Sequence, residues 1–239
     1  MRDVELEIAA GERVGIVGPS GAGKTTLLRL LNGTLRPASG SVKVGGEDLR
    51  DHSRRQLRRV RSHIGTVHQD LSLIPNLRVV QNVLAGKIGR LSLLGAMRLL
   101  FLTPRAEVRR VYELLDRVGI AEKLYERTDR LSGGQMQRVA IARALFQEPA
   151  ALLADEPVSS VDPARARDTV ALLAEISRER SLTLCVSLHN LELAREFLPR
   201  LVGLRHGRVV FDRQTADLGE DDFHALYDLA PEEMLADGS

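Results

Sequence analysis

The sequence predicts an α/β fold in which helices cover a largely parallel sheet and a helical segment interrupts the chain. Residues 150–154 and 182–188 are largely apolar, as is typical of interior strands buried on both faces. Between about residues 71 and 145, leucine and valine instead recur every three to four residues, which indicates helices. Because strand-like segments flank this stretch on both sides, we expect an α/β core split by a helical insertion.

The first part of the chain reads as strands and turns around one helix. Alternating apolar and acidic residues predict a half-buried strand at 4–8, and a second strand is expected at 14–17. A helix begins at Lys24 and is expected to stop at Gly33, which suits the residue after a helix C-terminus. Two further short strands are expected, at residues 41–44 and 64–68.

The second part returns to strands after the helical stretch. A helix is expected at 164–180, between the two apolar strands, and a closing hairpin at 201–204 and 209–211. The acidic tail from Asp221 is expected to end in a short helix. We expect one domain over residues 1–239, made of a nucleotide-binding core (1–70 and 146–215), a helical subdomain (71–145) and a tail (216–239).

Composition excludes several classes of function. With 44% hydrophobic and 28% charged residues, the 239-residue chain has the make-up of a globular protein, and its net charge of +2 is too small for nucleic acid to be expected as a partner. The charge is unevenly spread, since six arginines lie within a dozen residues. These arginines indicate a solvated helix face or, as the alternative, contact with anionic lipid or an acidic partner: Arg50, Arg54, Arg55, Arg58, Arg59 and Arg61.

The cysteine and the apolar stretches bear on location. Cys185 is the single cysteine and lies in an apolar run, so we expect a buried, inert thiol in a reducing compartment. The N-terminus lacks the apolar region of a signal peptide, and residues 91–102 are too short to span a bilayer and contain Arg98. We therefore expect a cytoplasmic protein that reaches a membrane only through a partner.

A glycine-rich run, GPSGAGKTT at residues 18–26, matches the pattern G-x-x-x-x-G-K-[ST] between a strand and a helix. Its glycines let successive N–H groups point at phosphate oxygens, and the following helix adds the positive end of its dipole. Lys24 is expected to reach the β- and γ-phosphates, and the Thr25 hydroxyl to bind Mg²⁺. The remaining residues expected to cradle the nucleotide are Gly18, Pro19, Ser20, Gly21, Ala22, Gly23 and Thr26.

Two carboxylates end the apolar strand at 151–154. Asp155, at the tip of an interior parallel strand, is expected to hold Mg²⁺ directly or through water. Glu156 is expected to face the γ-phosphate and to polarise the attacking water. The alternative interpretation is that the two acids are solvated loop residues without a role in catalysis. The run LLADEP in a chain that also has a phosphate loop argues against it.

A second phosphate-binding helix start is predicted at LSGGQ, where Ser132, Gly133, Gly134 and Gln135 open an amphipathic helix. One nucleotide has one triphosphate tail, and residues 18–26 already account for it. The second cradle therefore makes sense if it serves the nucleotide of another copy, in a head-to-tail pair with two-fold symmetry.

These motifs resemble those of ABC transporter ATPases over almost the whole chain. The resemblance implies a P-loop core with a parallel sheet, a small antiparallel β subdomain and an inserted helical subdomain that carries the signature LSGGQ. It also implies a Q-loop glutamine at Gln69 that senses Mg²⁺ and water, a D-loop at residues 159–162 whose Asp162 contacts the partner subunit, and a switch histidine at His189. The implied cofactors are ATP and Mg²⁺.

Within the family, phosphonate importer ATPases are the most similar group that we recognise. Softer likenesses support this, at residues 69–74, 82–86, 91–101, 154–157, 203–212 and 223–227. The implied partners are a second copy, integral membrane permease subunits and, indirectly, a periplasmic or lipid-anchored solute-binding protein. The implied location is peripheral, on the cytoplasmic face of the membrane.

The chain departs from the family pattern at its start, since no aromatic residue precedes the phosphate loop and the first is Phe101. We expect the first strand and its adenine-stacking aromatic to be missing, through the choice of start site or trimming. Stacking of a base on an aromatic is worth roughly 1–3 kcal/mol, so a version extended upstream should bind ATP more tightly. Met136 and Ser160 also differ from the commonest family residues without removing a group that the chemistry needs.

Other classes of nucleotide-binding protein share some of these features. An ABC ATPase for another solute (an amino acid, a metal or lipoprotein export) shares the same motifs. A soluble ABC ATPase of DNA repair or translation would usually carry long coiled-coil insertions or two cassettes, and neither is present. A GTPase switch would need an N-K-x-D motif, and an inactive regulator would not need Glu156 and His189.

Overall fold

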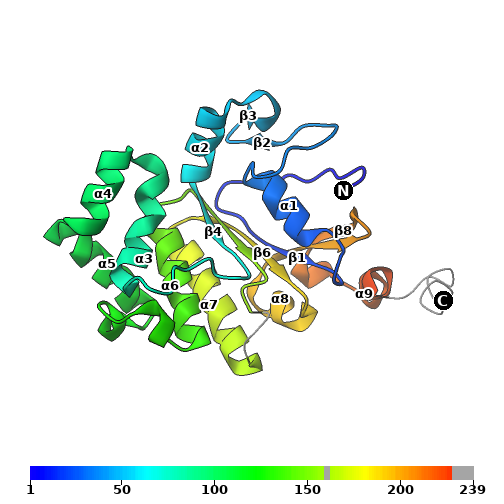
Figure 1. Ribbon diagram of the computed structural model, residues 1–239. Coiled ribbons are helices and arrows are strands. Elements are labelled where there is room, and N and C mark those ends of the chain that lie inside the picture. The colour runs from blue at the N-terminus through cyan, green and yellow to red at the C-terminus, as the bar shows by residue number, and fades with distance from the viewer. Residues whose placement is uncertain (159–161, 228–239) are drawn as a thin grey trace, which may run out of the picture.

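The computed structural model describes residues 1–158 and 162–227. In this part of the chain a six-stranded sheet has the order β4-β5-β6-β1-β7-β8, parallel except for the edge strand β8 (Figure 1). The strands of this sheet are β1 (Arg13–Val17), β4 (Ile64–Val67), β5 (Ala151–Asp155), β6 (Thr183–Leu188), β7 (Arg200–Arg205) and β8 (Arg208–Gln214). A separate hairpin joins β2 (Lys43–Val44) to β3 (Glu47–Asp48) through Gly45 and Gly46, both at positive φ.

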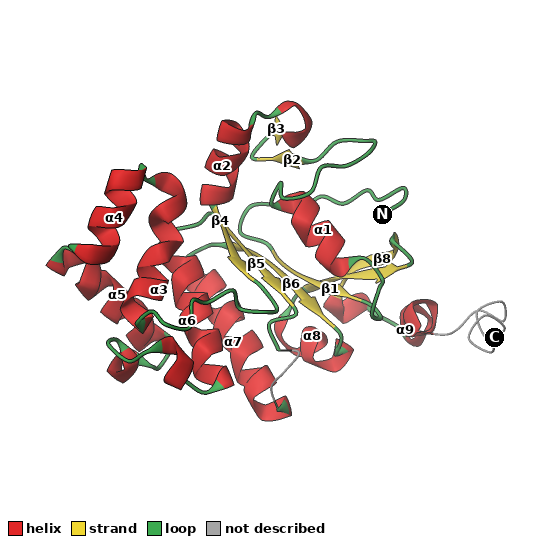
Figure 2. Ribbon diagram, viewed as in Figure 1, coloured by secondary structure: helices red, strands yellow, loops and turns green. Residues whose placement is uncertain are grey.

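Helices cover both faces of the sheet. Figure 2 shows α1 and α2 on the side of the β2–β3 hairpin, with α6, α7 and α8 on the other side and α3 to α5 gathered beyond β4. The α-helices are α1 (Lys24–Leu31), α2 (Arg54–Ser62), α3 (Val79–Leu84), α4 (Leu93–Phe101), α5 (Arg105–Arg117), α6 (Gly133–Phe146), α7 (Pro163–Glu179), α8 (Leu191–Phe197) and α9 (Glu220–Tyr227). Short 3₁₀ turns lie at Leu49–Asp51, Ala85–Arg90, Ala121–Lys123, Thr128–Arg130 and Thr215–Asp217.

Alternation along the strands builds two apolar cores. On one face Ile16, Leu153 and Cys185 pack with Leu27 and Leu28 of α1. The strand neighbours of these residues point the opposite way, into a larger core shared with α3 to α9. Burial of a leucine- or isoleucine-sized side chain is worth roughly 1.5–3 kcal/mol, so these cores fix the sheet and its register. No helix among the described residues combines the length and the hydropathy needed to cross a bilayer.

The fold class expected from the sequence is confirmed, and one predicted element is wrong. Residues 4–8 show the predicted alternation, and Leu6 and Ile8 pack against the core on the α1 side, but the segment forms no strand. Alternation of apolar and polar residues indicates which side chains face the core. A strand also needs a neighbouring backbone with which to form hydrogen bonds. The short helix α8 was not predicted; it begins where the Asn190 side chain accepts a hydrogen bond from the Leu193 N–H.

Candidate functional site

The register of the sheet brings the predicted site residues to one edge. Val17 of β1 lies opposite Leu188 of β6, and Asp155 of β5 lies opposite Ser187 of β6. The glycine-rich loop, the acidic pair and His189 therefore leave neighbouring strands at the same end. Carboxyl ends of parallel strands form the usual binding edge of an open α/β sheet.

The glycine-rich loop needs its glycines for steric reasons. A Cβ added at Gly18 would lie 2.1 Å from the Leu204 carbonyl oxygen, so β7 leaves no room for a side chain. Gly23, at the N-cap of α1, has a φ of +107°, which L side chains rarely adopt. As a glycine, Gly23 has no side chain that could cap the first N–H groups of α1. The loop thus ends in an uncapped helix N-terminus, which favours an anion.

Lys24 lies in this loop with only 3% of its surface exposed. Its Nζ donates to the carbonyl oxygens of Gly18 at 2.9 Å and Pro19 at 3.0 Å, and it lies 3.5 Å from Oε1 of Glu156. Burial lowers the pKa of the Lys24 ammonium, and the charge of Glu156 opposes that shift. The Lys24 side chain therefore folds back onto the glycine-rich loop to which Lys24 belongs.

Asp155 is the centre of a second group. The hydroxyls of Thr25 and Ser187 both donate to its Oδ1, at 3.1 and 2.9 Å, and Asp155 is 8% exposed. A carboxylate beside a hydroxyl is the hard-oxygen set that Mg²⁺ prefers, with phosphate and water oxygens as its other ligands. Among the described residues no cluster of three or more His, Cys, Asp or Glu could hold a metal without such help. The residues present fit Mg²⁺ brought with a nucleotide.

Glu156 adopts a strained backbone, with a φ of +45° that is uncommon outside glycine. The Ser187 hydroxyl accepts a hydrogen bond from the Glu156 N–H at 2.8 Å and so supports this conformation. The Oε1 of Glu156 lies 2.6 Å from Nε2 of His189. The second ring nitrogen of His189, Nδ1, lies 3.2 Å from Nζ of Lys24. Lys24, Glu156 and His189 thus form one hydrogen-bonded cluster.

The predicted second cradle lies at the start of α6. Ser132 is the N-cap: its hydroxyl accepts from the Gln135 N–H, and the Gln135 side chain accepts from the Ser132 N–H. Among the described residues, a Cβ at Gly133 would meet nothing within 4 Å, and one at Gly134 would meet only Arg165, at 3.8 Å. Serine and glutamine therefore fix the helix start, and the two glycines keep its surface open.

Two predicted residues lie away from the cluster. Gln69 follows β4 by two residues, is exposed and makes no hydrogen bond to the described residues. Asp162 is exposed and caps α7, where its carboxylate accepts from the Arg165 N–H and pairs with the Arg165 side chain. Residues 159–161 of the predicted D-loop lie outside the described residues.

The structure adds two residues that the sequence did not single out. Ser187 is fully buried and joins Asp155 to the Glu156 backbone; its signal was a hydroxyl inside an apolar strand, two residues before His189. Tyr227, on α9, donates its hydroxyl hydrogen bond to the His189 carbonyl oxygen at 3.0 Å. No local pattern indicates that contact, because it joins residues 38 positions apart.

Known proteins are similar to this chain over most of its length. The family model described as ABC transporter matches residues 1–159. A phosphonates import ATP-binding protein PhnC of Anaeromyxobacter dehalogenans is 51% identical over 95% of this chain, which spans 45% of that protein's length. Relatives of the same description from Halalkalibacterium halodurans and Pseudomonas fluorescens are 43% and 48% identical, over 95% of this chain and 87% and 85% of theirs.

Solved structures agree with the fold. The ABC transporter component cbiO1 of Clostridium perfringens has a TM-score of 0.77 at 30% identity, covering 98% of this chain and 85% of its own. The ATP-binding cassette MJ0796, in a dimeric structure with ADP and phosphate, has a TM-score of 0.74 at 31% identity over 88% of both chains. With the family model matched over most of the chain and relatives so similar over most of their length, this protein belongs to the ABC transporter family.

Proposed function

We propose that this chain is the ATP-binding and ATP-hydrolysing subunit of an ABC importer that carries a phosphonate or a related phosphorus oxyanion across the cytoplasmic membrane. The observation that carries the proposal is the cluster of Lys24, Thr25, Asp155, Glu156 and His189 around one glycine-rich loop. The relatives named for phosphonate import supply the substrate class.

Nucleotide binding would use the loop and the helix behind it. The N–H groups of residues 18 and 20–26 and the N-terminus of α1 would face the phosphates, and Lys24 would contribute its charge to the β- and γ-phosphates. Thr25 and Asp155 would hold Mg²⁺, which neutralises charge on the phosphate oxygens. Gln69 would complete the metal site by moving inward from its exposed position after β4.

Hydrolysis would use Glu156 and His189. Glu156 polarises the attacking water, and His189 binds the γ-phosphate. The contacts within the cluster suggest an order of events, because Lys24 and His189 both contact Glu156. A γ-phosphate would compete with Glu156 for both partners. Its arrival would free the carboxylate for the water, so the base becomes available when the substrate is in place.

A second copy would complete each site. The open surface at Gly133 and Gly134, with Ser132 and Gln135, would cradle the γ-phosphate of the partner's nucleotide, and Asp162 would contact the partner. Closure of this head-to-tail pair, followed by reopening after hydrolysis, converts the reaction into a movement. Residues 71–145 would move as a subdomain against the core at 1–70 and 146–215, with 216–239 as a tail.

The membrane partner would bind the helical subdomain. On and beside α4, the side chains of Leu94 and Leu102 are 81% and 74% exposed, and Met97 is also exposed. Apolar side chains this exposed favour contact with another protein, here the permease subunits on the cytoplasmic face. The solute-binding protein would contact the permease rather than this chain.

Growth on a phosphonate tests the proposal. A bacterial strain that lacks its own phosphonate importer would receive this chain with the permease and solute-binding protein encoded beside it, and methylphosphonate as the sole phosphorus source. We expect growth with the native chain and none with Glu156→Gln. Purified protein should hydrolyse ATP in the presence of Mg²⁺. Hydrolysis without growth would reject phosphonate as the solute; failure of both would reject the whole proposal.

A further inference from the structure

Two of the six arginines that stand out in the sequence, Arg54 and Arg61, line a cavity in the structure. The cavity has a volume of about 550 Å³ and lies between α2 and the turn after α1. Its lining consists of Gly33, Thr34, Arg36, Arg54, Leu57 and Arg61. A volume of this size suits a small-molecule site.

The cavity has a defined floor and basic walls. Arg54, Leu57 and Arg61 are three and four residues apart along α2, so they share one face of the helix. Leu57 is buried, and a Cβ on Gly33 would lie 3.1 Å from its Cδ2. Because Gly33 also has a φ of +65°, a side chain there would be both crowded and strained. Glycine at position 33 therefore lets the backbone pack closely against Leu57, and no side chain of this residue enters the cavity.

The positive charge around the cavity is not compensated within the described residues. No carboxylate there lies within 4.0 Å of the guanidinium groups of Arg36, Arg54 or Arg61, and two acids of the preceding segment pair with other residues. Asp48 pairs with Arg50, and Glu47 with His52.

Most of the donors on these arginines remain available. Arg36 donates to the His52 carbonyl oxygen at 2.6 Å, and Arg61 to the Gly33 carbonyl oxygen at 3.5 Å. Each guanidinium has five N–H donors, so these two bonds use a small part of the total. Arg54 makes no hydrogen bond to the described residues through its side chain.

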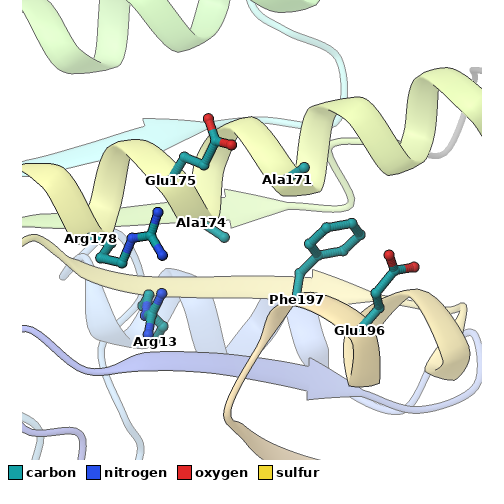
Figure 3. A pocket seen from close by; sticks show the side chains of 7 residues that line it. All are labelled: Arg13, Ala171, Ala174, Glu175, Arg178, Glu196 and Phe197. Carbon is teal, nitrogen blue, oxygen red and sulfur yellow. The ribbon is translucent and has the colours of Figure 1, made fainter.

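A second cavity of the same protein has a lining of mixed charge. It has a volume of about 230 Å³ and lies between the start of β1, α7 and α8 (Figure 3). Its lining carries Arg13 and Arg178 but also Glu175 and Glu196, which pair with Arg117 and Arg167 respectively. That lining has no net charge, whereas the cavity beside α2 carries three positive charges and no negative one.

From this geometry we propose that the cavity beside α2 binds an anion bearing a phosphate or phosphonate group, either free in solution or as a lipid headgroup. The planar fork of arginine matches the oxygens of such groups, and several guanidinium groups around one space favour a multiply charged anion. The site is separate from the glycine-rich loop, because the eight residues of α1 put roughly 12 Å of helix between them. The inference goes beyond the proposed function and does not depend on it.

Binding to the full chain tests the proposal, with Mg·ADP at saturation so that the nucleotide site is filled. Calorimetric titrations with inorganic phosphate, pyrophosphate and methylphosphonate cover the soluble anions. Sedimentation with phosphatidylglycerol vesicles, compared with phosphatidylcholine vesicles, covers the lipid source. The cavity variant is Arg54→Gln/Arg61→Gln.

The matched control is Arg55→Gln/Arg59→Gln. It removes the same charge from exposed positions of the same helix, lines no part of the cavity and, like the cavity variant, leaves the cap between Ser53 and Gln56 intact. Both variants should keep the native thermal unfolding curve and basal ATP hydrolysis, which separates loss of binding from loss of folding.

We expect one saturable site per chain, with affinity reduced at least about tenfold in the cavity variant and less than about twofold in the control. That pattern with a soluble anion, or with phosphatidylglycerol vesicles alone, supports the proposal and identifies the source. Equal losses in both variants would show a diffuse effect of helix charge and overturn it. Absence of saturable binding to every probe would overturn it as well.

Discussion

The Nε2 of His189 lies 2.6 Å from the Oε1 of Glu156, while the Nδ1 of the same ring lies 3.2 Å from the Nζ of Lys24. A neutral imidazole protonated on Nε2 satisfies both contacts, since it donates to the carboxylate and accepts from the ammonium. The residues proposed to act on the γ-phosphate and on the water are therefore connected directly to one another.

Glu156→Gln should lower steady-state ATP hydrolysis at least about 100-fold, because an amide cannot accept the proton of the attacking water. ATP binding should persist, and the ATP-bound dimer should accumulate. Phosphate release and size-exclusion chromatography with ATP measure the two effects. Glu192→Gln, an exposed position in the first turn of α8, is the control and should behave like the native protein. Near-normal turnover by Glu156→Gln would exclude Glu156 as the critical base.

Ser187→Ala should destabilise the protein and weaken its use of Mg²⁺. The change removes one donor to Asp155 and the acceptor for the Glu156 N–H, so we expect the free energy of unfolding to fall by about 1–3 kcal/mol. The Mg²⁺ concentration for half-maximal hydrolysis should rise several-fold. Urea unfolding and Mg²⁺ titrations measure both quantities.

Ser177→Ala is the matched control for that change. Ser177 is equally buried, on α7, but its hydroxyl has no hydrogen-bond partner among the described residues. Its removal should leave the free energy of unfolding unchanged or slightly higher. Equal destabilisation by the two substitutions would show that the Ser187 hydrogen bonds contribute nothing specific.

The pH dependence of ATP binding should report on Lys24. Burial lowers the native pKa of Lys24 below its ordinary value of 10.5, and the ammonium is the form that attracts phosphate. As the pH rises through this lowered pKa, ATP affinity should fall and binding should take up protons. Calorimetry in buffers of different ionisation heat measures this uptake. Lys24→Arg stays charged, so proton uptake that persisted unchanged in that variant would contradict the assignment.

The same shift has a consequence for folding, with a definite sign. Between the lowered native pKa and 10.5, the unfolded chain binds more protons at Lys24 than the folded chain does. The contribution of this residue to stability therefore rises with pH across that window. In Lys24→Arg that contribution should be absent, and the difference between the two unfolding curves across alkaline pH measures it.

Cys185 should resist thiol reagents in the folded protein. It is buried in the core on the α1 side, and burial raises its pKa to about 12, so almost no thiolate forms near neutral pH. Labelling with a maleimide should be slow in buffer and complete in denaturing urea. Stoichiometric labelling within seconds under native conditions would show that the strand β6 opens readily.

Tyr227→Phe should change turnover more than binding. The substitution removes the hydrogen bond to the His189 carbonyl oxygen, and burial raises the pKa of Tyr227 so that its phenol remains a donor. As a positioning residue, Tyr227 should affect kcat by roughly two- to tenfold, with little change in KM or in thermal stability. Tyr125→Phe, exposed and on the helical side, should leave kcat unchanged. Equal kcat values for Tyr227→Phe and the native chain would remove α9 from the mechanism.

The sequence predicted those parts of the fold whose conformation depends on residues adjacent in the chain. The glycine-rich loop, the acidic pair after β5 and the capped start at Ser132 each depend on a few adjacent residues. The strand expected at 4–8 failed because pairing depends on a backbone far along the chain. The roles of Ser187 and Tyr227 were not predicted, because their hydrogen bonds join residues 31 to 38 positions apart in the sequence. The partnership of Glu156, Lys24 and His189 likewise follows from strand order rather than from spacing.

The bare glycines at the start of α6 carry a genetic consequence. Under the proposed head-to-tail pairing, Gly133 and Gly134 of one copy serve a nucleotide that belongs to the other, so no copy can work alone. A cell that makes native and Glu156→Gln chains together would assemble many mixed pairs, each with a blocked site. The defective allele should therefore be dominant, and growth on a phosphonate should fall more steeply than the share of native chains.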